Sequence, residues 1–454
     1  MKRIHIILYA LLCSLSLMAQ GEVHEMSASY VWPADTLVRQ RLQAWQDLKF
    51  GILLHWGLYS VPGIVESWSI CDEDWIRRDT TRTYQQYKDW YWGLADEFKP
   101  EGFNPKQWAD VSQRAGMKYM VFTTKHHDGF CMWDSRETDF TIARHAFAGD
   151  ARRDALRHVL DAYRAAGFMV GTYFSKPDWH SPYYWWDVYA TKGRNVNYNV
   201  SQHPWRWAQF KRFTHAQVKE ILTRYGHVDI LWLDGGWVCK ENGQDIDMPA
   251  LATMARRAQP GLLIVDRTVR GAYENYLTPE RGVPAEAVGC PWESCIPLSD
   301  DWGWVDQPRW KSAEQVVATL IEVVAKGGNL LLGVGPTPNG TIEPAAVRRL
   351  EAIGQWLKKN GEAIYATRPL PCYRSGDVWF TQAKDGLRRY ALYVPPHTQA
   401  ELPATISWKG NLPTPKTTMR LLPTGEELSW RTEGDSVCVQ LPKHLPREAI
   451  AISF

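Results

Sequence analysis

Short apolar runs alternate with amphipathic stretches from Trp45 to about Ala366. Six of the runs predict strands: Phe50–Leu54, Tyr119–Thr123, Met169–Tyr173, Ile230–Leu233, Leu262–Val265 and Asn329–Val334. Five stretches between them predict helices: Pro105–Ala115, Ala151–Ala166, Trp207–Tyr225, Met248–Ala258 and Ala313–Ala325. Helix-then-strand repetition on this scale predicts parallel strands joined by crossover helices.

The length of this alternation favours an α/β fold, a (β/α)8-like TIM barrel. No Gly-x-Gly-x-x-Gly follows the first strand, which disfavours a dinucleotide-binding sheet. Six clear strands are fewer than the eight of a regular barrel, so we expect an irregular one. Val347–Asn360 is predicted to be its last helix, because Gly361 follows as a stop signal.

From Pro369 onward the chain consists of short extended runs that prolines and glycines separate. The runs are Val378–Gln382, Arg389–Val394, Thr405–Trp408, Met419–Leu422, Val437–Leu441 and Ile450–Phe454. This pattern is typical of a small antiparallel β-sandwich. We therefore predict a catalytic barrel over residues 20–368 and a C-terminal accessory β-sandwich over residues 369–454.

The N-terminus has the three parts of an export signal. Lys2 and Arg3 supply positive charge, Ile6–Leu17 an apolar core, and Ala19 a small residue suited to cleavage. The apolar core is too short to span a bilayer. Residues 1–19 are therefore predicted to be a signal peptide, and the mature protein to be periplasmic or secreted, with no membrane span.

Composition narrows the class of partner. The formal net charge of +2 argues against a nucleic-acid or anionic-membrane partner. Tryptophan is abundant, with 24 residues. Indole faces stack on the C–H faces of sugar rings, but a dense core would need them too, so the count leaves both interpretations open. The eight cysteines contain no Cys-x-x-Cys pair, and we expect no disulfide framework.

Polar residues cluster directly after the predicted strands. In a barrel, side chains at the carboxyl ends of the strands form the active site. The clusters are His55-Trp56-Gly57, Lys125-His126-His127-Asp128-Gly129-Phe130 with Trp133 behind it, Asp234-Gly235-Gly236 and Asp266-Arg267. Folding gives no reason for two histidines and an aspartate in one such place, whereas a site that grips several hydroxyl groups does.

Asp234 is the strongest catalytic candidate. It follows the apolar run Ile230–Leu233, and two glycines after it leave room for a substrate. A carboxylate there can attack an anomeric carbon and form a glycosyl ester. The same position also fits the N-cap of a helix. Spacing alone does not separate these two roles.

The other candidates also allow more than one interpretation. His126 and His127 fit hydrogen bonds to sugar hydroxyls, a metal site or satisfied core histidines. Adjacent residues on an extended segment point to opposite sides, so the pair would be a poor chelate, and we expect no metal and no cofactor. Glu66, near Trp68 in the loop after the first strand, fits a solvated loop carboxylate. Arg267 fits either an ion-pair partner or a substrate ligand.

Seven segments give the chain a family resemblance: Phe50–Ser60, Lys125–Phe130, Leu231–Gly235, Trp292–Cys295, Trp302–Trp304, Lys326–Leu332 and Gly354–Gly361. With these segments in this order, the chain resembles the α-L-fucosidases of glycoside hydrolase family 29 from about Trp45 to Ala366. The resemblance implies an exo-acting, retaining hydrolysis of terminal α-L-fucose from fucosylated oligosaccharides or glycoconjugates, through a covalent intermediate.

The resemblance also implies roles for single residues. Asp234 stands where the family places its nucleophile, and Arg267 matches a residue near the carboxylates. Six residues stand where the family grips the fucose: His55, Glu66, Trp68, His126, His127 and Trp232. The acid/base varies between subgroups, and this chain offers Glu274, Glu280, Glu286 and Glu293. We rank Glu293 ahead of Glu274 because it lies in a Trp-Glu-x-Cys motif, which also puts Cys295 near the active site.

Two loops depart from the family pattern. A serine separates glutamate and tryptophan in Glu66-Ser67-Trp68, and Trp302-Gly303-Trp304 replaces Trp-Gly-Tyr. These departures leave open which fucosyl linkage is cut. The sequence also does not determine the oligomeric state. The alternative function is a non-catalytic fucose-binding protein on the same scaffold. Loss of the nucleophile would indicate such a binder, and Asp234 is present.

Overall fold

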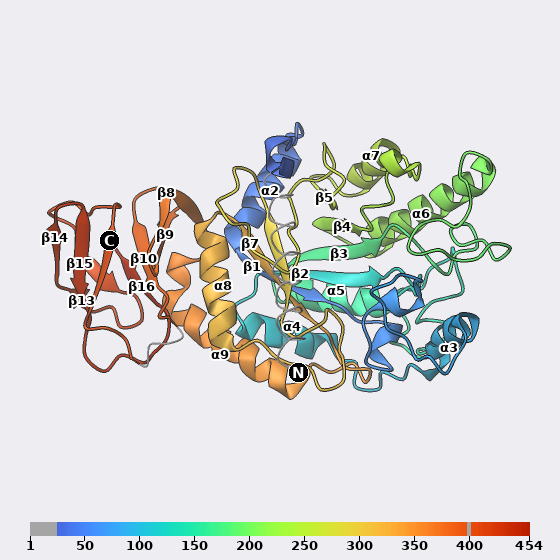
Figure 1. The fold of residues 1–454 in the computed structure, drawn as a ribbon, viewed down its shortest axis with the longest axis horizontal. Helices are drawn as coiled ribbons and strands as arrows, with labels where there is room; N and C mark the ends of the chain where they lie inside the picture. Colours follow the sequence, from blue (N-terminus) through green and yellow to red (C-terminus); the bar gives the residue numbers. More distant parts are fainter. Residues whose placement is uncertain (1–24, 397–400) are drawn as a thin grey trace.

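A curled sheet of seven parallel strands is the centre of the molecule (Figure 1). The computed structural model describes residues 25–396 and 401–454, so the predicted signal peptide lies outside the described residues. The strands are β1 (Phe50–Leu54), β2 (Tyr119–Lys125), β3 (Met169–Ser175), β4 (Ile230–Asp234), β5 (Leu263–Asp266), β6 (Glu293–Pro297) and β7 (Asn329–Val334). Their order is β5-β4-β3-β2-β1-β7-β6. The six predicted strands are confirmed, and β6 was missed because its sequence Glu-Ser-Cys-Ile-Pro is no apolar run.

An irregular segment, residues 273–281, lies between β5 and β6 and completes the barrel. Its first part forms an antiparallel bridge from Glu274 to β5, and its second part forms two parallel bridges, one from Leu277 to Trp292 just before β6 and one from Glu280 to Cys295 in β6. The amide of Cys295 donates to the carbonyl of Pro279 over 3.1 Å. The predicted barrel is therefore present, with an irregular segment where a regular barrel has its eighth strand.

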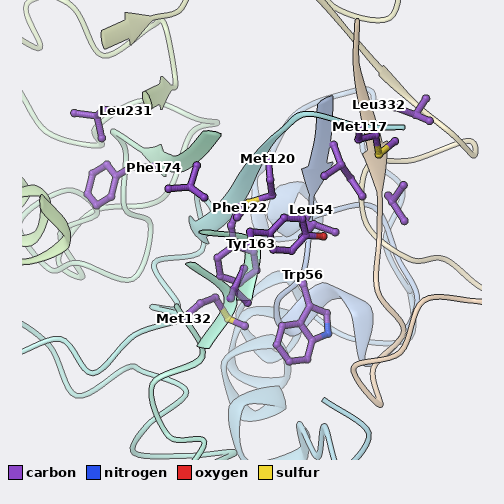
Figure 2. Packing of buried hydrophobic residues seen from close by; sticks show 14 of the residues in the cluster. Leu54, Trp56, Met117, Met120, Phe122, Met132, Tyr163, Phe174, Leu231 and Leu332 are labelled. Atoms are coloured by element: carbon purple, nitrogen blue, oxygen red, sulfur yellow. The ribbon is translucent and has the colours of Figure 1, made fainter. Parts of the chain in front are cut away.

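Side chains along each strand point alternately into the barrel and toward the helices, as the pleat requires. On β2, Met120 and Phe122 pack in the large cluster under the helices (Figure 2), whereas Val121 belongs to the interior cluster. On β4 the interior residue is Trp232. Asp234 has the same parity as Trp232 and is the last residue of its strand, so the fold directs its carboxylate into the mouth of the barrel.

Helices cover the outside of the sheet (Figure 1). They are α2 (Thr36–Leu48), α3 (Tyr84–Glu97), α4 (Pro105–Arg114), α5 (Ala155–Ala165), α6 (Pro204–Arg224), α7 (Met248–Ala258), α8 (Ala313–Ala325) and α9 (Pro344–Asn360). α7 and α8 have the predicted bounds. α5 begins later than predicted because the Asp154 side chain accepts the Arg157 N–H and caps it. Along the described residues, no helix is long and apolar enough to cross a membrane.

The C-terminal region forms two antiparallel sheets around a core of its own, in agreement with the predicted sandwich. One sheet has the order β13-β12-β16-β10-β9-β8 and the other β11-β15-β14. The strands are β8 (Thr367–Ser375), β9 (Val378–Ala383), β10 (Arg389–Tyr393), β11 (Thr405–Lys409), β12 (Met419–Leu421), β13 (Glu427–Leu428), β14 (Trp430–Glu433), β15 (Ser436–Gln440) and β16 (Ile450–Ser453).

The C-terminal region is attached to the barrel at the end where the strands begin. Arg368 and Lys384 both pair with Asp47, at 2.5 and 2.6 Å, and Asp47 lies in the helix that leads into β1. The indole N–H of Trp356 in α9 donates to the carbonyl of Ala449 over 2.6 Å. This domain therefore supports the barrel from the side opposite to the carboxyl ends of the strands.

Candidate active site

A cavity of about 340 Å³ opens at the carboxyl ends of the barrel strands, where the polar clusters were predicted to meet. It is lined by Leu53, His55, Trp68, His126, His127, Tyr173, Arg194, Trp232, Asp234, Gly236, Trp237, Arg267, Thr268, Glu280 and Trp302. Four predicted site residues do not line it: Glu66, Glu274, Glu293 and Cys295. A larger cavity of about 590 Å³ lies between α8, α9 and the C-terminal domain, and no predicted site residue lines that one.

Asp234 is held as a carboxylate by a cation and a phenol. Arg267 Nη1 donates to its Oδ1 over 2.9 Å, and the Tyr173 hydroxyl donates to its Oδ2 over 2.6 Å. Burial would raise the pKa of Asp234, but Arg267, His127 and Tyr173 outweigh it and keep the pKa well below its usual range. Asp234 caps no helix, because the helical turn that follows β4 starts at Lys240 with Cys239 as its N-cap.

Three histidines form one wall of the cavity. His55 follows β1, and His126 and His127 follow β2 with ring centres 4.3 Å apart. The expectation that this pair points to opposite sides is wrong, because β2 ends at Lys125 and the amide of Gly129 donates to the carbonyl of His126, which turns the chain. Both rings therefore face the cavity.

The histidines are neutral hydrogen-bonding groups. Burial lowers the pKa of His126 to about 4 and the pKa values of His55 and His127 well below the usual range. His126 Nδ1 shares a hydrogen bond with Ser67, and His127 Nδ1 shares one of 2.8 Å with Ser175. These contacts use one ring nitrogen of each and leave the other for a ligand.

Arg267 joins Asp234 to a second carboxylate that also lines the cavity. Its Nη2 donates to Glu280 Oε2 over 2.8 Å, while its Nη1 holds Asp234. The Trp302 indole N–H donates to Glu280 Oε1 over 3.3 Å. Glu280 lies in the irregular segment that closes the barrel and remains half open to solvent, with 43% of its side chain exposed. One guanidinium thus organises two carboxylates at the cavity.

Glu293 lies beneath the cavity, inside the barrel. It is the first residue of β6 and is fully buried. The Tyr119 hydroxyl donates to its Oε2 over 2.7 Å, and the Trp232 indole N–H donates to its Oε1 over 3.2 Å. Burial raises the pKa of Glu293 to about 7 against these hydrogen bonds. Its carboxyl group supports Trp232, a wall of the cavity, from behind.

Glu274 supports a loop. Its two oxygens accept the amide N–H groups of Thr268 and Arg270 over 2.8 and 3.0 Å. Both residues have positive φ, of 61° and 66°, so the carboxylate stabilises a backbone conformation that residues other than glycine rarely adopt. Burial raises the pKa of Glu274 to about 7. This loop carries Arg267 and Thr268 into the cavity.

Glu66 and Cys295 also lie behind the cavity wall. The buried Glu66 accepts the amide N–H of Gly303 over 2.7 Å and so connects the Glu66-Ser67-Trp68 loop to the Trp302-Gly303-Trp304 loop. Cys295 is buried, and its thiol contacts the carbonyl of Pro279 at 3.6 Å, within the closing segment. The seven cysteines in the described part of the chain are all free.

Lys125 and Asp128, which flank the histidine pair, are turned away from the cavity and anchor the loop. Lys125 Nζ donates to Asp178 and Gln217, at 3.0 Å each. The Tyr91 hydroxyl donates to Asp128 over 2.7 Å. The segment from Lys125 to Asp128 therefore contains two histidines that face the cavity and two charged residues that fix the loop in place.

Sequence reasoning missed several lining residues, including Tyr173, Arg194 and Trp237. The only available signal was for Tyr173, which lies near the end of a predicted strand. Arg194 lies in the long loop between β3 and α6, away from any strand end. Its guanidinium lies 4.7 Å from the Trp68 ring and 5.1 Å from the Trp237 ring. Within residues 25–396 and 401–454, no group of three or more His, Cys, Asp or Glu side chains could hold a metal ion.

Comparison with known proteins gives consistent matches. The family model described as Alpha-L-fucosidase matches residues 17–362. The alpha-L-fucosidase of Branchiostoma floridae is 30% identical over 437 residues, 90% of either chain. Alpha-L-fucosidase isoenzyme 1 from Paenibacillus thiaminolyticus has a TM-score of 0.77 at 30% identity, over 92% of this chain and 99% of that one. A GH29 alpha-L-fucosidase from Bacteroides thetaiotaomicron, trapped as a covalent intermediate with 2-fluoro-fucosyl fluoride, has a TM-score of 0.74 at 26% identity, over 91% and 95%.

Proposed function

The chain belongs to the alpha-L-fucosidase family, and we propose that its cavity removes terminal α-L-fucosyl groups with Asp234 as nucleophile and Glu280 as acid/base. The protein is a glycosidase that works with retention, by double displacement. The observation that carries the residue assignment is the single guanidinium of Arg267, which holds both carboxylates at the cavity.

The two carboxylates have the arrangement that retention needs. Retaining glycosidases keep their carboxyl groups about 5–5.5 Å apart, and inverting enzymes separate them by about 6.5–9.5 Å to admit a water. Two oxygens that bond to neighbouring nitrogens of one guanidinium, at 2.9 and 2.8 Å, favour the short separation. Glu274 and Glu293 are less suited, because neither lines the cavity.

The reaction proceeds in two steps. In the first, Glu280 enters with a proton taken from solvent through its exposed side; the Asp234 carboxylate attacks C1 and forms a glycosyl ester while Glu280 gives that proton to the departing oxygen. In the second, Glu280 removes a proton from water, and this water attacks C1 and releases Asp234. Arg267 keeps Asp234 ionised before the attack.

The histidines and tryptophans that line the cavity recognise the fucose. The neutral rings of His55, His126 and His127 can donate to and accept from sugar hydroxyls. Trp68 and Trp232 provide apolar faces, and we assign Trp232 to the C5 methyl group. The substrates are fucosylated oligosaccharides or glycoconjugates.

The test is hydrolysis of a chromogenic α-L-fucoside by the purified mature protein, with a chelator present. We expect release of the chromophore, with the α-anomer of fucose as the first product in a proton NMR time course. The β-anomer as first product would contradict retention. A protein that binds fucose but releases nothing, from this substrate or from a panel of fucosylated oligosaccharides, would instead be the non-catalytic binder.

Export is a separate part of the proposal. Its support is the signal pattern of residues 1–19, with Lys2 and Arg3 before an apolar core and Ala19 at the cleavage position. We expect the protein outside the cytoplasm, with a mature mass that corresponds to a start at Gln20. Full-length protein in the cytoplasmic fraction would contradict this.

A further inference from the structure

The cavity is small, and a sugar attached to the fucose has to lie at its mouth. At about 340 Å³ it is at the lower end of ligand pockets. Trp75 lies beside this mouth with 54% of its surface exposed. Its ring centre is 5.4 Å from that of Trp68, which lines the cavity and lies 5.1 Å from His127. An exposed indole thus continues the cavity wall outward.

The indole of Trp75 is fixed in place. Its N–H donates to Glu73 Oε2 over 2.9 Å. Glu73 in turn accepts two hydrogen bonds from the Arg194 guanidinium, at 2.7 and 2.5 Å, and one from its backbone N–H at 3.1 Å, and Arg194 itself lines the cavity. The guanidinium of Arg194 also contacts the rings of Trp68 and Trp237. A ring held in this way loses little conformational freedom when a ligand stacks on it.

Arg194 also has a donor to offer. Its Nε and Nη2 are used by Glu73, and no acceptor among the described residues takes a hydrogen bond from Nη1. Its charge is already compensated by Glu73. The group is therefore suited to a hydroxyl rather than to a carboxylate or sulfate.

We propose that Trp75 and Arg194 form a subsite for the sugar that carries the fucose, and that this sugar is a neutral hexopyranose. One C–H face of the ring stacks on the Trp75 indole, and a hydroxyl accepts from Arg194 Nη1. The inference rests on the proposed function, because it requires a fucosyl group in the cavity.

Other exposed tryptophans do not share these connections. Trp205 is as exposed as Trp75, at 56%, but within the described part of the chain its one ring contact is with Arg206, which does not line the cavity. Trp205 is therefore a matched control for Trp75.

The experiment compares Trp75→Ala and Trp205→Ala on fucosylated oligosaccharides and on α-L-fucosyl fluoride, whose leaving group is a single atom. Trp75→Ala should lower kcat/KM for the oligosaccharides about tenfold, mainly through KM, and leave the fluoride unchanged. Trp75→Phe should recover part of the loss. Trp205→Ala should change neither.

Two results would overturn the subsite: an equal loss by Trp75→Ala on both substrates, or no loss on any oligosaccharide. Failure of the unmodified protein to hydrolyse the fluoride is a different result. It would overturn the proposed function itself, and the subsite with it.

Discussion

The cavity and the barrel interior beneath it both contain carboxyl groups, but the groups that bond to these carboxyls differ. In the cavity, Asp234 and Glu280 are joined by the charged Arg267. In the interior and behind the loop, Glu293 and Glu274 are held by neutral donors alone, and burial raises the pKa of each to about 7. Arg267 keeps Asp234 ionised for attack, and the exposed side of Glu280 lets it exchange protons with solvent, whereas Glu293 and Glu274 do not line the cavity.

The comparison also shows how the interior serves the cavity. Trp232 stacks on Tyr173 with ring centres 5.2 Å apart, and Arg267 lies 4.6 Å from its ring. Both of these neighbours bond to Asp234. The single polar atom of this indole donates to Glu293. Our proposal therefore gives Glu293 a positioning role, exerted on Asp234 through Trp232 and then through Tyr173 or Arg267.

The largest expected effect is at Asp234. Asp234→Gly should lower kcat on the order of 10⁴-fold, because the covalent step is lost. Azide fits the space of the missing carboxylate and attacks from its side, so it should restore turnover and give β-L-fucosyl azide, identified by NMR. Glu293→Gly with azide should give no β-azide. Formation of that product by the Glu293 variant, and not by the Asp234 variant, would reverse the assignment.

The second prediction contrasts Glu280→Gln with Glu293→Gln. Loss of the acid should lower kcat/KM for fucosylated oligosaccharides about 10²–10⁴-fold and have little effect on kcat/KM for α-L-fucosyl fluoride, which needs no protonation to leave. The kcat for the fluoride should fall, because hydrolysis of the glycosyl ester loses its base. Glu293→Gln should lower kcat/KM for both substrates by a similar and smaller factor, because its effect comes through Trp232. Strong dependence on the leaving group in Glu293→Gln alone would make Glu293 the acid/base.

The smallest effect concerns stability. The folded protein raises the pKa of Glu293 from 4.5 to about 7, so this carboxyl contributes stability below pH 4.5 that is lost as the pH rises through about 7. Glu293→Gln cannot ionise. The decrease in unfolding free energy between pH 5 and 7.5 should therefore be smaller in the variant, by on the order of 1–3 kcal/mol.

Urea unfolding of both proteins at the two pH values measures this difference. Asp234→Asn is the control: the pKa of Asp234 is lowered in the folded state, so its contribution is complete above pH 3.8 and is lost only in more acidic solution. Its slope between pH 5 and 7.5 should match that of the unmodified protein. An unchanged slope in Glu293→Gln would show that the carboxyl is not held neutral.

The sequence predicted the strands well, and with them the residues that follow directly. Apolar runs mark buried parallel strands, and the first polar residue after each run must emerge at the rim. His55, His126, His127 and Asp234 were found in this way. β6 was missed, because a strand of Glu, Ser, Cys, Ile and Pro has no apolar run to mark it.

The choice among the glutamates could not be made from the sequence. Motif membership favoured Glu293, but the register of β6, in which Glu293 pairs with Asn329 at the start of β7, puts it at the deep end of its strand. No sequence pattern distinguished Glu280 from the other glutamates, because it lies in an irregular segment whose course depends on β5 and β6. Position in a motif says nothing about depth.

The sequence by itself predicted the architecture, from periodicity and strand ends, and the family, from its motifs, because these are local properties of the chain; it also offered Asp234 as the candidate nucleophile. Only the tertiary structure decided which carboxyl groups face the cavity, which histidine nitrogens are engaged, and that Arg267 joins Asp234 to Glu280. Burial, charge pairing and access to the cavity depend on residues far apart in the chain, so no local pattern decides them.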